Sequence, residues 1–157
     1  MYQAEERTAA PMADTTSMIA PRSRTSYQAW VNIPIRFGDI DSMGHVNNAV
    51  IATYFEHARC MLVMPQILPA ARGNLNVVLA RIIIDYVREI RFPGAVDVGV
   101  RVSRIGGKSF AVAGAVFIGE TCFATSEATM VFFNTATRTA MEPTPEARAM
   151  LAAMQSG

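Results

Sequence analysis

The chain has 157 residues and a mass of 17.1 kDa, a size at which a single domain buries roughly two thirds of its unfolded surface. Its net charge of +1, with 17% charged residues, excludes the broad basic field that neutralises nucleic acid phosphates. Although 51% of the residues are hydrophobic, the apolar runs are shorter than the roughly 20 residues that a bilayer span requires. We therefore expect one soluble domain with no nucleic acid partner and no membrane span.

Residues 1–26 mix Ala, Thr, Ser and Pro with scattered charges and follow neither a strand nor a helix period. We interpret them as a flexible tail that precedes one domain over residues 27–157. The tail lacks the basic and apolar regions of a secretory signal, and Cys60 and Cys122 are too few for a disulfide framework. The expectation is a cytoplasmic protein with both cysteines reduced.

A strand is predicted from Trp30 to Phe37, because hydrophobic residues alternate there with other residues. The alternating positions are Val31, Ile33, Ile35 and Phe37. Pro34 has no N–H to donate to a neighbouring strand, so it indicates an edge strand or a local irregularity.

A polar turn from Asp39 to Asn48 leads into an apolar run from Ala49 to Met64. Hydrophobic residues recur in this run at helical spacing, which predicts one long helix with a broad apolar face. They are Val50, Ile51, Tyr54, Phe55, Ala58, Met61 and Leu62. Asn47 is the predicted N-cap, and Pro65 is the predicted end of the helix.

Four runs rich in β-branched residues follow, over 76–92, 96–105, 109–118 and 121–134. Their connectors Pro93-Gly94, Gly106-Gly107 and Gly119-Glu120 are short turn signals, so successive strands are predicted to pair antiparallel as hairpins. A short helix is predicted from Pro145 to Met154. This order of elements is typical of an α+β fold, in which an antiparallel sheet must wrap one long central helix to bury it.

The turn before the long helix concentrates the side chains that are capable of chemistry. It holds the carboxylates of Asp39 and Asp41, the imidazole of His45 and two carboxamides. The start of a helix leaves about four N–H groups without internal partners and carries roughly half a positive charge, so it can hold an oxyanion. A carboxylate just upstream could attack a substrate or activate water. Both aspartates could instead cap the turn, which is the interpretation that we prefer for Asp39.

The run from Ile35 to Asn48, with Tyr54-Phe55-Glu56 and Ala58-Arg59 downstream, resembles the signature of the hotdog-fold acyl-CoA thioesterases, and most of all the 4-hydroxybenzoyl-CoA thioesterase branch. The similarity covers about residues 28–152. It implies a sheet curled around the central helix, and subunits that pair edge to edge into a dimer or a tetramer. It also implies active sites at the interface and an acyl-CoA substrate. We expect no metal, and no cofactor apart from the CoA of the substrate.

The resemblance assigns the catalytic carboxylate to Asp41, and it assigns the backbone N–H that polarises the thioester carbonyl to Asn48. His45 could orient the substrate or tune Asp41, or it could simply bond to the backbone. Glu56 is a further catalytic candidate if it faces the substrate pocket, but it could also merely pair with Arg59 or with an arginine of another strand.

The turn Gly106–Ser109 has free N–H groups and a lysine, a combination that can hold a diphosphate. It is not a nucleotide P-loop, because Val102 stands where that loop needs a glycine and a strand follows in place of a helix. By similarity to the family, Lys108 and Ser109 are predicted to contact CoA, with Arg104 as a companion.

Together these features predict an acyl-CoA thioesterase, a hydrolase that releases a free carboxylic acid and CoA. One alternative is a thioesterase that acts on acyl carrier protein, and another is a non-catalytic hotdog protein that binds or senses acyl-CoA. The carboxylate near the helix start favours catalysis, because a binding protein has no need of a carboxylate beside a thioester. The sequence has no Gly-x-Ser-x-Gly motif of the serine hydrolases.

Overall fold

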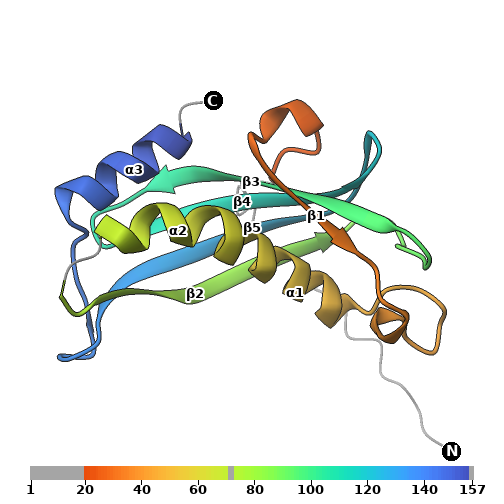
Figure 1. The fold of residues 1–157 in the computed structure, drawn as a ribbon, viewed down its shortest axis with the longest axis horizontal. Helices are drawn as coiled ribbons and strands as arrows, with labels where there is room; N and C mark the ends of the chain where they lie inside the picture. The colour runs from red at the N-terminus through yellow and green to blue at the C-terminus, as the bar shows by residue number, and fades with distance from the viewer. Residues whose placement is uncertain (1–19, 71–72, 156–157) are drawn as a thin grey trace, which may run out of the picture.

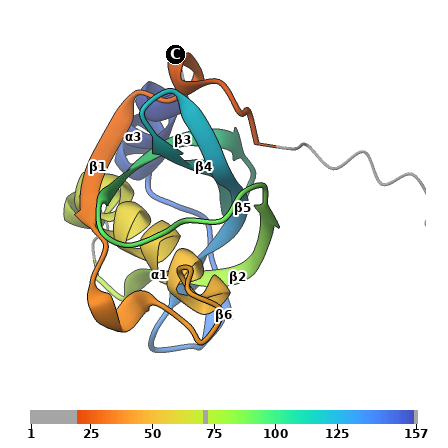
Figure 2. The same cartoon turned by 90° about the vertical axis from the view of Figure 1, so that its right-hand side faces the viewer.

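The computed structural model describes residues 20–70 and 73–155. Within these ranges an antiparallel sheet curls around one long helical segment, and a C-terminal helix, α3 (Pro145–Gln155), lies at one end of the sheet (Figure 1). Figure 2 looks along the helical segment and shows the sheet wrapped around it. This is the hotdog arrangement, so the fold predicted from the sequence is confirmed, as is the C-terminal helix.

Five long strands form the sheet in the order β1-β3-β4-β5-β2, and a short strand, β6, pairs with β5. Their bounds are β1 Ala29–Pro34, β2 Leu75–Tyr86, β3 Ala95–Ile105, β4 Ser109–Ile118, β5 Thr121–Asn134 and β6 Thr139–Ala140. The predicted hairpins β3–β4 and β4–β5 are confirmed. The predicted hairpin between β2 and β3 is wrong, because β1 pairs with β3 while β2 crosses to the far edge and pairs with β5.

Strand β1 lies at an edge of the sheet, as Pro34 indicated, but it is shorter than predicted. A 3₁₀ turn, Phe37–Asp39, follows it. Oδ2 of Asp39 stabilises this turn by accepting a hydrogen bond from the backbone N–H of Arg36 at 2.9 Å. This turn carries Phe37 out of the strand alternation, so its side chain is 81% exposed. The prediction that Phe37 continues the buried face is therefore wrong.

The central helix consists of α1 (Asn48–Ala58), a π-helical turn (Arg59–Val63) and α2 (Met64–Ile67). Asn47 is the N-cap, since its Oδ1 accepts a hydrogen bond from the N–H of Ala49 at 2.8 Å. Pro65 does not end the helix as predicted. It enters in the first turn of α2, directly after the π-helical turn, where the N–H that proline lacks is not needed.

The core lies between the central helix and the concave face of the sheet. Ile51, Phe55, Ala58 and Val63 are buried on the helix side, against inward residues of β3, β4 and β5 that include Val98, Val100, Val112, Val116, Ala124 and Ala128. Phe55 reaches the backbone of β4 because Gly114 has no side chain. A Cβ there would lie 3.0 Å from Cδ1 of Phe55.

A second, smaller cluster covers the convex face of the sheet. The ring of Tyr27 packs edge-on against Trp30 and Phe117, with centroids 6.0 and 6.2 Å away. Arg24 pairs with Asp97 at 2.8 Å and lies over the Trp30 ring at 4.2 Å. The described structure thus begins at Ala20, seven residues before the predicted start of the domain. Residues 1–19 of the predicted tail lie outside the described residues. No helix within those described residues is long and apolar enough to cross a membrane.

Candidate active site

The polar turn between β1 and α1 is a closed loop held by its own backbone. The N–H of Asn47 donates to the carbonyl of Asp39 at 2.9 Å, and the N–H of Asp41 donates to the carbonyl of His45 at 3.0 Å. Gly44 has a φ of +85°, a conformation that glycine adopts without steric cost. These bonds fix the side chains of the turn relative to the start of α1.

Asp39 braces this turn from inside. It is only 2% exposed, and its carboxylate accepts hydrogen bonds from the N–H and Nε of Arg36 at 2.9 and 3.0 Å and from Oη of Tyr54 at 2.8 Å. Burial alone would raise the pKa of Asp39, but the hydrogen bonds from Arg36 and Tyr54 outweigh burial and hold this pKa below its ordinary value. Asp39 is thus an ionised structural residue with its oxygens occupied.

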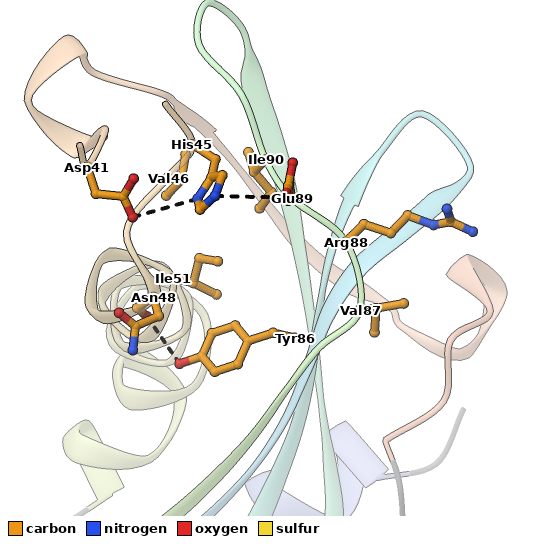
Figure 3. Close-up of a pocket in the computed structure, with 10 residues that line it drawn as sticks. All are labelled: Asp41, His45, Val46, Asn48, Ile51, Tyr86, Val87, Arg88, Glu89 and Ile90. Carbon is orange, nitrogen blue, oxygen red and sulfur yellow. Dashed lines mark hydrogen bonds and ion pairs between the residues drawn. The ribbon is translucent and has the colours of Figure 1, made fainter. Parts of the chain in front are cut away.

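A cavity of about 370 Å³ opens beside the turn (Figure 3). The turn and helix α1 form one wall of the cavity, and the irregular segment that follows β2 forms the other wall. The lining residues are Asp41, His45, Val46, Asn48 and Ile51 on the first wall and Tyr86, Val87, Arg88, Glu89 and Ile90 on the second. The backbone joins the two walls, because the N–H of Val46 donates to the carbonyl of Ile90 at 2.7 Å.

The two oxygens of Asp41 have different surroundings. Oδ1 accepts a hydrogen bond from the N–H of Met43 at 2.8 Å, which is a local bond within the turn. Oδ2 lies 3.6 Å from Nδ1 of His45, too far for a hydrogen bond. The side chain is 23% exposed and lines the cavity. One oxygen therefore anchors the carboxylate while the other is available to a reacting group.

The imidazole of His45 lies between two acidic side chains. Its Nδ1 faces Asp41, and its Nε2 lies 3.8 Å from Oε1 of Glu89. Glu89 in turn pairs with Arg91 at 3.0 Å. Figure 3 shows the ring in this bridging position between the two walls of the cavity. His45 thus lies between the turn and the segment that follows β2, near a carboxylate of each.

The backbone N–H of Asn48 is the first of helix α1. The cap side chain of Asn47 takes the N–H of Ala49, and the Asn47 carbonyl takes the next two N–H groups. Nothing among the described residues accepts a hydrogen bond from the N–H of Asn48. Tyr86 donates from its hydroxyl to the Asn48 carbonyl at 3.2 Å, which ties β2 to the helix start. An unpaired donor at the positive end of a helix can stabilise an anion.

A family model, the thioesterase-like superfamily, matches residues 35–153, which include the turn, the central helix and most of the sheet. The chain belongs to the thioesterase-like superfamily. Among curated relatives, the uncharacterized protein YsmA of Bacillus subtilis is 26% identical over 102 residues, which are 64% of this chain and 69% of that protein.

Two solved structures extend the likeness to the whole fold of this thioesterase-like protein. The PA5185 protein of Pseudomonas aeruginosa is 27% identical, with a TM-score of 0.76 over 86% of this chain and 96% of that one. A thioesterase of Thermus thermophilus, solved in complex with coenzyme A and zinc, is 26% identical, with a TM-score of 0.70 over 83% and 96% of the two chains. In the thioesterase-like chain itself, the described residues contain no group of three or more His, Cys, Asp or Glu side chains placed to hold a metal ion.

The structure brings only some of the predicted site residues of this superfamily member together. Asp41, His45 and Asn48 line one cavity. Glu56 lies exposed two turns further along α1 and does not line it. Lys108, Ser109 and Arg104 lie at the β3–β4 turn. The strand register places this turn level with Val78, toward the Leu75 end of β2, whereas the cavity lies at the Tyr86 end. One chain therefore does not bring the predicted CoA-binding residues to the cavity.

Sequence reasoning missed the second wall of the cavity. The prediction extended a strand to Phe92, whereas the regular pairing of β2 ends at Tyr86. The N–H groups of Val87 and Arg88 still donate to the Phe123 carbonyl of β5, and residues 87–90 line the cavity. The charged residues Arg88, Glu89 and Arg91 interrupt the apolar alternation, and this was the signal that could have marked the end of the strand.

Proposed function

We propose that this member of the thioesterase-like superfamily hydrolyses acyl-CoA to a free carboxylic acid and CoA. The observation that carries the proposal is that Asp41, with one carboxylate oxygen free of hydrogen bonds, and Asn48, the first residue of helix α1, line one cavity. Thioester hydrolysis needs these two groups, because one acts on the carbonyl carbon and the other stabilises charge on the carbonyl oxygen. The likeness to a thioesterase solved with coenzyme A supports the choice of substrate.

Asp41 acts on the thioester carbon either directly or by taking a proton from water. In both cases the oxygen of water ends on the acyl carbon, the carbon–sulfur bond breaks, and a proton ends on CoA sulfur. The N–H of Asn48 donates to the carbonyl oxygen as it becomes negative. A general base contributes about 10² to 10⁴ in rate, and one oxyanion donor contributes roughly 2.7 to 4 kcal/mol. The thiolate leaves without strong acid assistance.

His45 orients Asp41 in this proposal. Its ring faces the free oxygen of Asp41 on one side and Glu89 on the other, so it limits the rotation of the carboxylate. Glu56 has no place in the single-chain cavity, and we assign no chemical step to it within one chain. Ile51 on one wall of the cavity and Tyr86 on the other supply apolar surface, and the acyl group begins its path between them in this proposal.

The free edge of β2 is the proposed contact with a second copy. One side of β2 pairs with β5, and no described strand pairs with the other side. The strand is long, and it exposes Val78, Leu79 and Tyr86 by 40, 44 and 51%. Exposed apolar edges of this kind pair with other strands. We propose that two copies join their β2 strands antiparallel across a twofold axis, which forms one continuous sheet.

This pairing gives the β3–β4 turn a role. An antiparallel pair of β2 strands sets the Leu75 end of one copy beside the Tyr86 end of the other. The second copy's β3–β4 turn then lies at the same end as the cavity, three strand spacings or about 14 Å away. The nucleotide part of CoA can extend over that distance from a thioester at Asp41. We propose that the partner's Lys108 and the partner's Ser109 contact it, with the partner's Arg104 beside them.

A thioester panel tests the function. The purified protein is incubated with acyl-CoA and acyl carrier protein substrates of several acyl groups, and thiol release is measured. We expect turnover of acyl-CoA and a decrease of roughly 10² to 10⁴-fold in Asp41→Asn. Glu142→Gln is the control, since it changes an exposed carboxyl group outside the cavity. Turnover of carrier substrates alone would move the assignment to a carrier thioesterase. Acyl-CoA binding without any thiol release would make the protein a binding module.

A further inference from the structure

Arg59 is a buried cation without an acceptor. The residue lies at the start of the π-helical turn of the central helix and is only 5% exposed. Its Nη1 is buried and has no hydrogen-bond partner, and no described carboxylate lies within ion-pair distance of the guanidinium. Burial lowers the pKa of Arg59. The charge of Glu56 in the same chain offsets this shift only in part. A buried charge that has lost its water needs a paired opposite charge or several acceptors, and no described residue forms an ion pair with this guanidinium or accepts a hydrogen bond from it.

Arg59 and Glu56 lie on the flank of the helix that faces β2. Residues 48, 52, 56 and 59 follow helical spacing and share one side of the helix. The first of these, Asn48, lines the cavity together with Tyr86 of β2, which places this flank on the β2 side of the helix. The opposite flank carries Tyr54, which bonds to Asp39 beside β1.

Glu56 is the complementary group on the same flank. Its side chain is exposed, and no described residue forms an ion pair or a hydrogen bond with it. Glu56 and Arg59 are only one helical turn apart, yet they do not form an ion pair with each other within 4 Å. One flank therefore presents an unpaired anion and an unpaired cation side by side. A surface with this property is complementary to its own copy under twofold symmetry.

The proposed edge-to-edge dimer places two such flanks opposite each other. The central helix runs antiparallel to β2 above the sheet (Figure 1). A twofold axis through the middle of β2 sets the two helices side by side with opposite directions. Glu56 and Arg59 lie near the middle of the helical segment 48–67, so each comes level with the other residue of the second copy. We propose that Glu56 of each copy pairs with the partner's Arg59, which gives two buried ion pairs at the interface.

This inference rests on the dimer of the proposed function and deepens it. The two ion pairs determine the register in which the copies dock, since a slip along β2 would leave both guanidinium groups without an acceptor. A slip of one residue would also turn every side chain of the strand to the other face. The pairs would thus fix each cavity relative to the partner's β3–β4 turn, and the predicted CoA contacts depend on that relation.

A charge-swap experiment tests the pairs. Glu56→Lys faces two like charges in its own dimer, and Arg59→Glu likewise faces two carboxylates. Each variant alone is expected to dissociate, with a dimer dissociation constant raised roughly 30-fold or more. An equimolar mixture of the two is expected to form a heterodimer, because both cross-pairs then join opposite charges. Native mass spectrometry distinguishes the heterodimer by mass, and analytical ultracentrifugation gives the dissociation constants.

The mixture separates contacts between copies from contacts within one chain. If Glu56 paired with Arg59 of its own chain, mixing would restore nothing, and this outcome would overturn the proposal. If circular dichroism shows that Arg59→Glu does not fold, the Glu56→Lys variant still tests the proposal by itself. An unchanged dimer dissociation constant in that variant would contradict the ion pairs. Glu120→Lys, a reversal at an exposed carboxylate of the β4–β5 turn, is the control and should leave the dimer intact. If the Glu56→Lys variant remained a dimer and still hydrolysed thioesters, the ion pairs would be contradicted and the proposed function would not.

Discussion

Nδ1 of His45 lies 3.6 Å from Oδ2 of Asp41, the oxygen of that carboxylate that the turn leaves without a hydrogen bond. The other oxygen is held by the N–H of Met43 at 2.8 Å. The carboxylate is thus anchored on one side and faced by an imidazole on the other. This division of roles distinguishes Asp41 from Asp39, whose two oxygens are both taken up by Arg36 and Tyr54.

Replacing His45 tests whether it orients Asp41. We expect His45→Phe to lower kcat by roughly 10 to 100-fold with little change in KM, because a carboxylate displaced by about 1 Å loses up to about 10²-fold in rate. Steady-state kinetics with acyl-CoA give both constants. Glu89→Gln is the matched variant, since it keeps the shape of the second neighbour of the ring and removes its charge. An unchanged kcat in His45→Phe would show that the turn alone positions Asp41.

The bracing role of Asp39 predicts a dependence of stability on pH. The pKa of Asp39 is held below the unfolded value of about 3.9. The stabilisation is therefore complete above about pH 4, and it is lost as the pH falls through the folded pKa. Asp39→Asn should cost about 2 kcal/mol at pH 7, and this cost should shrink at pH 3. Urea unfolding of both proteins at the two pH values measures the difference, and an equal cost at both would contradict an ionised brace.

A substitution at Gly99 of β3 tests how tightly the segment with Tyr27 and Trp30 packs on the convex face of the sheet. A Cβ at this position would lie 2.8 Å from Cη2 of Trp30 and 2.8 Å from Cβ of Tyr27, closer than such atoms approach. Gly99→Ala should therefore lower the free energy of unfolding by about 1 to 3 kcal/mol, because the segment must shift. Gly107→Ala is the control, since nothing lies within 4 Å of a Cβ there, and it should change stability by less than about 0.5 kcal/mol. Chemical denaturation compares the two.

The local parts of this structure were predictable from local chemistry. Strands β4 and β5 begin and end where their β-branched runs do, and Asn47 caps α1 because an amide oxygen satisfies a helix N–H. The end of the helix was not predictable, since a π-helical turn precedes Pro65 and the helix continues through the proline as α2.

The site was predictable only on its local side. The turn carries Asp41, His45 and Asn48 within eight positions, so their meeting follows from the chain itself. The other wall, Tyr86 to Ile90, meets them because β2 crosses to the far edge of the sheet. No local pattern encodes that pairing, since short turn signals at Pro93-Gly94 indicated a hairpin instead. The contacts proposed for the partner's Lys108 lie one step further from the sequence, because the proposal requires a second copy.

The proposed oxyanion donor can be removed without removing the helix. Asn48 is the first residue of α1, a position where proline is tolerated because its missing N–H has no partner in the helix. Asn47 has φ −59° and ψ 140°, the extended conformation that a residue before proline prefers. Asn48→Pro should therefore fold normally while deleting the donor.

We expect Asn48→Pro to lower kcat by roughly 10² to 10³-fold, as loss of one oxyanion donor does. Asn48→Ala keeps the backbone N–H and should retain most of the activity, so the pair isolates the backbone group from the side chain. Circular dichroism and thermal unfolding establish that both variants keep the fold, and thiol release gives the rates. If Asn48→Pro folded and turned over acyl-CoA like the unaltered protein, the carbonyl oxygen would have to be stabilised elsewhere in the cavity.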